Sequence, residues 1–469
     1  MTERTPFNYP EFLRDVARIA VPVALQHLLT TTGSMIDTMM LGRLGENTVG
    51  AVGLCAQFSS PMFSSYWGFI GGGMLFMSQY WGAKDASGLR KAYGITLTLC
   101  GMVGMLFSFL AAAAPGTVLS LYTDKEVIQE IGIRYLRVAG MSYILQCLAV
   151  AMSTLLRSTH RVRLPLYAGI ASVCTNCVCN YILIFGTFGA PKMGVVGAAW
   201  GTVIAQAVNL VIIIVYGICG KVPFLLEFRK IFHFEWGFIK EFFRKCFPIL
   251  MNEMAMGIST MLINIVLGRQ SAPAIAAVAV YRTIEGLIIA FFGGFASAAA
   301  IIIGNEVGAG HHEEAYRKAF RIVYLTSAVI AVVGLAVMAL HGPLFRAMGL
   351  SGESFAICTF LCGYYCLIAV IRMGNWQQND LFRAGGDPAF GSMMEITFMF
   401  LMVIPLVYLS HFVFHAPFKV VFLCVYSDEI IRYVIMQRRL YSGKWIQPVS
   451  EAGLATIGEF RKAHHISSR

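Results

Sequence analysis

Apolar residues come in long runs along this chain, separated by short polar stretches. Three of the clearest runs cover residues 96–115, 166–185 and 322–340. Each holds about 20 mostly apolar residues, the length at which a helix crosses the hydrocarbon core of a bilayer. Because a backbone in hydrocarbon must satisfy its own hydrogen bonds, these runs predict membrane-spanning helices.

The whole pattern predicts about twelve such helices. In the first half we expect them over residues 17–41, 50–80, 92–114, 128–155, 165–187 and 194–218. In the second half we expect them over residues 246–267, 273–303, 319–340, 355–381, 389–410 and 417–436. The sequence therefore predicts an all-α, polytopic membrane protein.

The second half repeats the layout of the first at an offset of about 226 residues. Four landmarks share this offset: Pro22 with Pro248, Arg43 with Arg269, Gly82 with Gly308, and Arg157 with Arg383. The repeat predicts two homologous six-helix lobes, residues 1–220 and 246–437, joined by a linker (221–245) and followed by a tail (438–469). Since six is even, both lobes enter the membrane from the same side, with a binding cavity between or within them.

Composition agrees with a membrane protein. Hydrophobic residues make up 57% of the 469 residues and charged residues only 13%, and the mean hydropathy is +0.68. These values exclude a water-soluble globular protein. Residues 1–15 carry Glu3, Glu11 and Asp15 without an apolar core, so we expect no secretory leader.

The net charge of +11 comes from basic residues that alternate between loops. One set of loops holds a single basic residue each, namely Arg43, Lys125, Lys192, Arg269, Arg346 and Lys419. The other set holds clusters, around residues 84–91, 157–163, 221–245 and 317–321 and after Arg432. This bias predicts a plasma-membrane protein whose clustered loops and termini are cytoplasmic. No nucleic-acid partner is needed to explain the charge.

Three regions have weaker signals. The linker 221–245 mixes phenylalanines with basic residues, which favours an amphipathic helix on the inner surface, although a plain basic tether explains it as well. The tail predicts a short helix around residues 451–464, without an assigned function. Cys174, Cys177 and Cys179 form a CxxCxC pattern, but no ligand pair follows at zinc spacing, so no metal is expected.

Eight motifs in order give the chain a resemblance to the multidrug and toxic compound extrusion (MATE) family of secondary transporters, over nearly its whole length. The first half contains DTMMLGRLG, QYWGAKD, LLRSTH, NCVCNYILIFG and MGVVGAAWGTVIAQ, and the second contains PILMNE, IIIGNEVGAG and FRAGGDPAFGSMMEI. The resemblance implies a MATE-like fold, with a cavity that opens to either side alternately. It also implies export of bulky, often cationic and amphipathic compounds, driven by inward flow of protons or sodium ions.

A polar cluster is expected in the first lobe. Asp37 lies near the outer end of the first helix, where MATE proteins carry an acid that takes part in proton coupling and drug release; an interfacial carboxylate is the alternative. Asn176 and Asn180 are one turn apart on the fifth helix and share a face. With Thr202 and Gln206 they fall at the depth of Asp37, which favours substrate binding, although packing amides explain them too. Some relatives have Asp at position 180.

The second lobe holds more acids within its spans, where a carboxylate costs a few kcal/mol. Glu253 lies about 12 Å deep by the helical rise per residue. With Asn252 it matches the MATE position whose acid binds the coupling cation. Glu395 falls where close relatives usually have Asp. Asp380 is expected near the inner boundary and solvated.

Two arginines are the expected charge partners. Arg282 is spaced to pair with Glu285, and Arg372 sits near where some sodium-coupled relatives carry an acid. If Arg282 and Arg372 each neutralise one acid among Glu253, Glu285 and Glu395, one carboxylate remains free to load and release a proton. A sodium site would need several oxygen ligands, and an adjacent guanidinium would oppose it, so proton coupling is favoured.

The predicted function is antiport, in which a drug and a proton compete for overlapping carboxylates. The residues expected to couple cations are Asp37, Glu253, Glu285 and Glu395, and those expected to bind substrate are Asp37, Asn176, Asn180, Thr202, Gln206 and Glu253. Aromatic and methionine residues around 63–77 line the cavity or simply pack. We expect a monomer in the lipid bilayer with a small-molecule substrate, no enzymatic activity, and no cofactor beyond a coupling proton or sodium ion.

Two alternatives stay open. A flippase for lipid-linked oligosaccharides would have a similar helix plan, but its cavity would hold several arginines where this chain shows two. A membrane-embedded enzyme would need an acid–base motif at a loop boundary. The only candidate is His311–His312, which is better explained as a solvated pair in a cytoplasmic loop.

Overall fold

The apolar runs of the first half form helices where they were expected. The computed structural model describes residues 8–220, 222, 225, 227 and 235–466, and all regular secondary structure in this part is helical. The first-half helices are α1 (Tyr9–Gly42), α2 (Glu46–Gly82), α3 (Ala86–Ala113), α5 (Glu126–Ser158), α6 (Arg163–Phe185) and α7 (Val195–Cys219), with a short α4 (Pro115–Ser120) before α5.

The second half begins with four long helices, α10 (Trp236–Leu267), α11 (Ala272–Gly308), α12 (His312–Ala347) and α13 (Gly352–Gly385). The eleventh predicted span follows as α14 (Pro388–Phe398) and α15 (Ile404–Tyr408), each continued by a π-helical turn, η1 (Met399–Val403) and η2 (Leu409–Val413). Part of the predicted linker lies outside the described residues, and its last ten residues belong to α10.

Ten helical segments in the described residues are long and apolar enough to cross a membrane. They cover ten of the twelve predicted spans, and the all-α, polytopic fold is confirmed. Among the other two, α2 is long enough, but it is rich in serine and glycine. The outer faces of the spans carry exposed apolar side chains such as Met102, Phe109 and Leu335, as lipid contact requires.

The last predicted span, 417–436, is wrong as one continuous helix. The chain forms α16 (Phe418–Cys424), turns, and continues as α17 (Glu429–Tyr441). The break carries Asp428, Glu429 and Arg432 into the protein interior. Arg432, which the sequence placed inside the last span, is therefore an interior residue.

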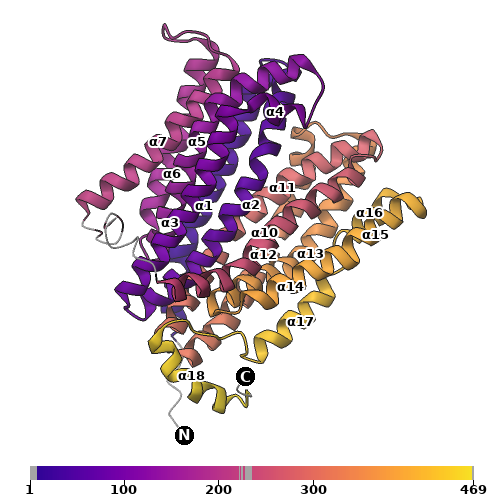
Figure 1. The fold of residues 1–469 in the computed structure, drawn as a ribbon. Coiled ribbons are helices and arrows are strands. Elements are labelled where there is room, and N and C mark those ends of the chain that lie inside the picture. Colours follow the sequence, from indigo (N-terminus) through magenta and orange to yellow (C-terminus); the bar gives the residue numbers. More distant parts are fainter. Residues whose placement is uncertain (1–7, 221, 223–224, 226, 228–234, 467–469) are drawn as a thin grey trace.

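The two halves pack as two lobes, visible side by side in Figure 1. Between them α1 packs on α11, and α2 packs on both α10 and α11. Helix α10 repeats α1, and α11 repeats α2. The symmetry operation of the repeat therefore converts the contact of α1 with α11 into the contact of α10 with α2. This exchange is the signature of a pseudo-two-fold axis between homologous lobes.

The landmark glycines of the repeat lie where α2 and α11 cross. A methyl group at Gly82 would collide with the backbone of Asn305, and one at Gly308 would collide with the backbone of Gln79. Glycine is required here because the two backbones approach too closely for any side chain. Asn305 is itself the repeat of Gln79 at the offset of 226 residues, so the symmetry of the sequence is also present in space.

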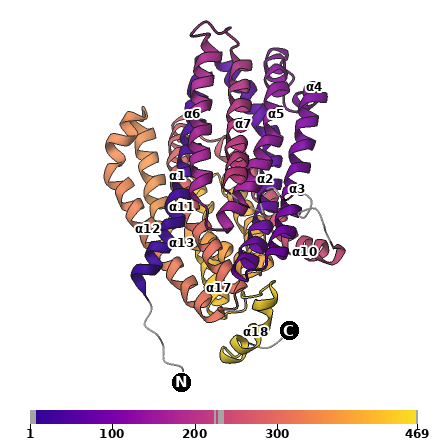
Figure 2. The same cartoon turned by 90° about the vertical axis from the view of Figure 1, so that its left-hand side faces the viewer.

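The described residues begin and end at one end of the bundle, which we call the termini side; the opposite end is the far side. Figures 1 and 2 show the start of α1 and the tail helix α18 (Glu451–Ala463) at this end. Helix order places the basic clusters around residues 84–91, 157–163 and 317–321 on the termini side. Singly charged loops such as those of Arg43 and Arg269 lie on the far side.

The tail covers the termini side. Its helix α18 confirms the helix expected around residues 451–464, and Ser450 caps it by accepting a hydrogen bond from the backbone N–H of Gly453. The segment before α18 is anchored by Trp445, which is fully buried. α18 then packs on α11 and α12.

Candidate functional site

A cavity of about 990 Å³ lies between the two lobes and is lined by α1, α2, α10, α11, α13 and α14. On α10 it extends from Asn252 to Ile265, two residues before that helix ends on the far side. On the termini side the crossing of α2 and α11 at Gly82 and Gly308 closes the space between the lobes. The cavity therefore faces the far side.

All the charged residues among the described lining residues come from the second lobe. They are the acids Glu253, Glu285, Asp380 and Glu395 and the arginines Arg282, Arg372 and Arg383. Their positions in the first lobe, at the offset of 226 residues, hold uncharged residues for the most part; Glu285 corresponds to Ser59 and Glu395 to Gly169. Glu253 corresponds to His27, which lines the cavity from α1. The lobes have thus diverged in charge while keeping their fold.

Glu253 and Asp380 share one arginine at the deep end of the cavity. Arg383 Nη1 lies 3.1 Å from Glu253 Oε1 and 3.7 Å from Asp380 Oδ1. The two acidic side chains are 29% and 31% exposed, and the arginine is 15% exposed. Asp380 was expected near the membrane boundary, and the structure instead places it on the cavity wall. Two carboxylates facing one guanidinium give this end of the cavity an excess of negative charge.

Glu285 holds both arginines that were predicted as charge partners. Arg282 Nη1 donates to its Oε2 at 2.8 Å, and Arg372 Nη1 donates to its Oε1 at 2.9 Å. Tyr426 donates a further hydrogen bond to Oε1 at 3.2 Å. The pair Arg282–Glu285 expected from the spacing is therefore present, whereas Arg372 does not neutralise Glu253 or Glu395, because it acts on the same carboxylate as Arg282.

Glu395 is buried and held by neutral and charged donors. Asn252 and Asn379 each donate an amide hydrogen bond to its Oε2 at 2.9 Å. Arg432 from the broken last span lies 3.5 Å from Oε1. This contact ties α17 to α14, and within α17 Arg432 also donates to Glu429 Oε2 at 2.8 Å.

The sequence had left Arg383 and Arg432 without a role in the site. Arg383 could have been found, because it is a landmark of the repeat: its counterpart Arg157 donates to Gln26 on α1 at 2.6 Å, and Arg383 donates to Glu253 on α10, the repeat of α1. Arg432 had no such signal, since the apolar run around it predicts a continuous span. Its burial depends on the break between α16 and α17.

The first lobe brings Asp37 together with both asparagines. Asn180 Nδ2 donates to Asp37 Oδ1 at 2.7 Å. The amide nitrogen of Asn176, in the orientation that satisfies its partners, lies 2.7 and 3.0 Å from the two carboxylate oxygens. Thr202 instead donates to the carbonyl of Ala198 in its own helix. Gln206 lies one turn further along α7 and is half-buried.

None of these five polar residues lines the interlobe cavity. For residues 63–77 we expected either cavity lining or core packing, and each holds for some of these residues. Ser64, Trp67 and Met74 line the cavity, whereas Phe76 and Met77 are buried in the core of the first lobe. The helical period of α2 separates these two sets onto different faces.

The histidine pair at the start of α12 is not solvated as a pair. His312 is buried, and its Nε2 lies 2.9 Å from the carbonyl oxygen of Gly453 in the tail. His311 is exposed, and its Nδ1 lies 3.1 Å from Glu306. The ring of His312 therefore takes part in docking α18.

Two homologous helical lobes around a charged cavity that is closed at one end define a secondary-transporter architecture. A sequence profile described as MatE matches residues 22–182 and 248–409, two segments that begin at the offset of the internal repeat. The chain belongs to the multidrug and toxic compound extrusion (MATE) family of transporters.

Known relatives agree with this assignment. The uncharacterized transporter YisQ of Bacillus subtilis (strain 168) is 22% identical over 413 residues, which cover 88% of this chain and 90% of the relative. A probable multidrug resistance protein NorM of Streptococcus pneumoniae (strain ATCC BAA-255 / R6) is 25% identical over 305 residues, 64% of this chain and 66% of the relative. A crystal structure of MATE in complex with MaL6 superimposes with a TM-score of 0.83 at 17% identity, over 94% of this chain and 100% of that one.

Proposed function

We propose that the protein is an antiporter that exports bulky, cationic, amphipathic compounds in exchange for protons. The observation that carries this proposal is the pair Glu253 and Asp380, which share Arg383 and are both partly exposed at the deep end of the cavity. The excess negative charge attracts a cation, and the 990 Å³ volume suits a bulky one. The name of the S. pneumoniae relative, a probable multidrug resistance protein, points in the same direction.

Exchange follows from competition for the same carboxylates. A substrate cation is bound when Glu253 and Asp380 together carry more charge than Arg383 can neutralise. A proton taken up by either carboxylate removes the excess charge, so the cation is released. Coupling also requires that the proton and the substrate favour opposite orientations of the cavity, since a ligand with equal affinity for both shifts nothing.

The other carboxylates differ in how firmly they are held. Both oxygens of Glu285 accept hydrogen bonds from arginines, so protonating it would sacrifice these bonds. We therefore assign Glu285 to structure and Glu395 to a supporting role in the cavity wall. Asp37 accepts hydrogen bonds only from neutral amides among its described partners, which leaves it as a second proton site in the first lobe.

The donor pattern supports protons over sodium. A sodium ion needs several oxygen ligands with free lone pairs. The carboxylate of Glu395 already receives two amide hydrogen bonds, and Arg383 stands beside Glu253 and Asp380 and would repel a metal cation.

The orientation that we propose places the termini side on the cytoplasmic side of the plasma membrane. The basic clusters gather on that side, as the positive-inside bias requires. The cavity then faces outward, and substrate leaves the cell from this conformation. The bundle forms its cavity from one chain, which supports a monomer.

The test is transport by the purified protein in proteoliposomes, with ethidium as the cationic probe. A pH gradient alone should drive ethidium against its concentration gradient, and a sodium gradient at equal pH on both sides should not. Asp380→Asn should abolish the pH-driven uptake. Uptake that follows only the sodium gradient would refute proton coupling, and no uptake under either gradient would refute export of cations.

A flippase for lipid-linked anions is the second candidate, and one observation favours it. Three arginines line the cavity instead of the two that were expected from the sequence. A fluorescent lipid-linked pyrophosphate placed in the same proteoliposomes distinguishes the two functions. Its protein-dependent movement between leaflets would favour the flippase, and its immobility would exclude it.

A further inference from the structure

The segment between α17 and α18, residues 445–450, contacts both lobes on the termini side, and we call it the strap. At its start, the buried indole of Trp445 packs against Gly385 at the end of α13. At its other end, Ser450 Oγ donates a hydrogen bond to the carbonyl of Gly308 on α11 at 2.6 Å. Both ends of the strap are therefore attached to the second lobe.

The helix that follows the strap is attached to the second lobe as well. Thr456 Oγ1 of α18 donates to the carbonyl of Gly310 at 3.1 Å, and His312 Nε2 lies 2.9 Å from the carbonyl oxygen of Gly453. Phe460 belongs to the same buried apolar cluster as residues of α11 and α12. Because the strap and α18 are held at several points on the second lobe, they should move with it.

The middle of the strap reaches the first lobe through Val449. Its backbone N–H donates to Gln79 Oε1 on α2 at 2.8 Å, and its side chain is buried in the apolar cluster that contains Tyr93 of α3 and Leu155 of α5. Gln79 is itself buried, and its Nε2 donates to the carbonyl of Ala384 on α13 at 2.8 Å. One side chain of the first lobe thus holds both the strap and the second lobe.

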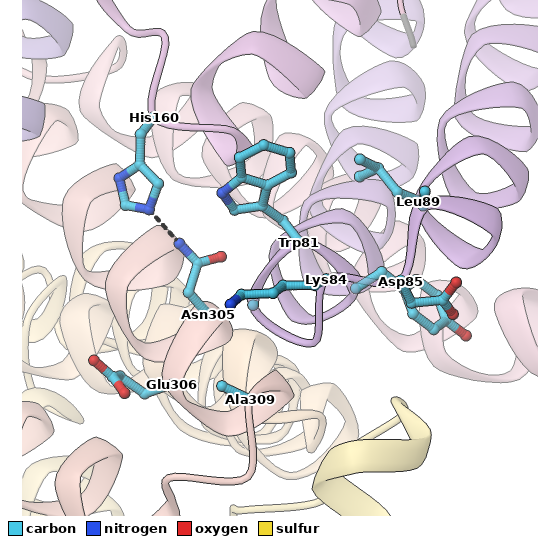
Figure 3. A pocket seen from close by; sticks show the side chains of 11 residues that line it. Trp81, Lys84, Asp85, Leu89, His160, Asn305, Glu306 and Ala309 are labelled. Atoms are coloured by element: carbon cyan, nitrogen blue, oxygen red, sulfur yellow. Dashed lines mark hydrogen bonds between the residues drawn. The ribbon is translucent and has the colours of Figure 1, made fainter. Parts of the chain in front are cut away.

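The repeat of Gln79 in the other half also reaches across to the opposite lobe. This residue is Asn305 on α11, and its Nδ2 lies 2.6 Å from Nε2 of His160, just after α5 (Figure 3). A pocket of about 560 Å³ borders that contact, whereas the strap lies against Gln79. The termini side is therefore closed by two similar interlobe contacts, and the strap reinforces the one made by Gln79.

Alternating access would break the contact of the strap with the first lobe. In a two-lobed transporter the cavity opens to the other side when the lobes rock apart there. Opening the termini side would separate the end of α2 from α11 and α13, and both hydrogen bonds of Gln79 cross that boundary. Since the strap stays with the second lobe, Val449 must leave the first lobe in every transport cycle.

We propose that the strap latches the termini side closed. Val449 and Gln79 form the latch, which engages when the cavity faces the far side and releases when the cavity faces the termini side. An interaction that is made in only one of two conformations shifts their populations toward that conformation. The strap thus sets how readily the empty cavity turns to the termini side. The proposal rests on the alternation of the lobes in the proposed transport function, but not on the identity of the substrate or the coupling ion.

The test is hydrogen–deuterium exchange of the purified full-length protein in detergent, which reports on both sides of the cavity at once. In Val449→Asp a charged group replaces the side chain that enters the first lobe, so the latch opens while the ends of the strap stay attached. Exchange should rise around residues 79–82 and 304–308, where α2 and α11 cross, by about five-fold or more, the size of one lost hydrogen bond. Exchange should fall in residues 256–265 of α10, which line the far-side part of the cavity, because a cavity that opens on one side closes on the other.

Two further variants separate a latch from simple loosening of the tail. Val449→Ala keeps the N–H donor and should change exchange in the same two directions by a smaller factor. Thr456→Val is the matched control: it removes a hydrogen bond of the tail that lies within the second lobe, so exchange at the crossing and in α10 should stay unchanged. Unchanged exchange in both Val449 variants, a rise without the fall in α10, or an equal effect of Thr456→Val would each overturn the latch. Ethidium is absent from this measurement, so its failure is distinguishable from failure of the proposed export.

Discussion

At the residue scale, the site depends on how the three arginines of the cavity wall are distributed over the acids of the second lobe. Arg282 and Arg372 meet on Glu285, whereas Arg383 is shared between Glu253 and Asp380. An acid with two cationic partners is stabilised as a carboxylate, and two acids with one partner leave negative charge uncompensated. The distribution of arginines therefore separates a structural carboxylate from the pair that binds cations.

Removing one acid of the shared pair should weaken binding of a cationic substrate. In Glu253→Gln the excess negative charge disappears, and the affinity for ethidium should fall by about ten-fold, equivalent to about 1.4 kcal/mol. Equilibrium binding by fluorescence anisotropy measures this change. Glu353→Gln, at an exposed acid on the far side, is the control and should bind ethidium normally.

Glu285 should matter for stability instead. In Glu285→Gln the buried Arg372 loses its nearest charged partner and keeps only the longer contact of 3.8 Å to Glu429; breaking a buried pair typically costs about 3–5 kcal/mol. The thermal unfolding midpoint in detergent should fall clearly. Arg282→Gln is the matched control, because Glu285 keeps Arg372 and the removed side chain is 35% exposed; a fall as large in this variant would contradict the assignment.

Contacts within one helix or between neighbouring turns could be predicted from the sequence, and contacts between distant helices could not. The spacing of Asn176 and Asn180 correctly indicated a shared polar face, and both reach Asp37. Glu253 and Arg383 are separated by 130 positions, and nothing in either local pattern pairs them. Only the repeat, which aligns Arg383 with Arg157, pointed to a common role.

At the element scale, hydrophobic periodicity located the helices but not their interruptions. The run over 417–436 is apolar enough for one span, yet the chain breaks after α16. Asn375 on α13 stabilises the break by donating to the backbone and side chain of Glu429. A break that is stabilised by another helix leaves no signal in the run itself.

The crossing of α2 and α11 should tolerate no side chain. Gly308→Ala would push a methyl group into the backbone of Gln79, and overpacking of this kind costs about 1–3 kcal/mol. Gly458→Ala, in α18 with nothing near the added group, should instead stabilise its helix by up to about 1 kcal/mol. Thermal unfolding of the two variants should shift in opposite directions; a shared direction would argue against a tight crossing.

The tail should be docked by its one buried tryptophan. Trp445→Ala removes a fully buried ring at a typical cost of about 3–5 kcal/mol, so α18 should detach before the lobes unfold. Limited proteolysis should then cleave the tail at least several times faster. Leu454→Ala, on the exposed face of α18, should leave the cleavage rate unchanged, and equal protection in both variants would show that the tail docks by other contacts.

At the scale of the whole molecule, the two lobes share one helix arrangement because the sequence is duplicated, and they differ in the charged residues that line the cavity. The paired helices α1–α11 and α2–α10 keep the two-fold arrangement, and the glycines of the crossing keep it in detail. The charged wall of the cavity belongs to the second lobe alone among the described lining residues. A two-lobed cavity was predictable from the repeat, whereas the asymmetry of its charge emerged only once the arginines were placed.

Proton release on substrate binding tests the central claim most directly. Purified protein in weakly buffered detergent solution near neutral pH is mixed with ethidium, and a pH indicator records the protons set free. The account predicts release of up to about one proton per bound cation, because the two ligands compete for one excess charge. Release should vanish in the double variant Glu253→Gln/Asp380→Asn. Ethidium binding without any proton release, or release that persists in the double variant, would contradict it.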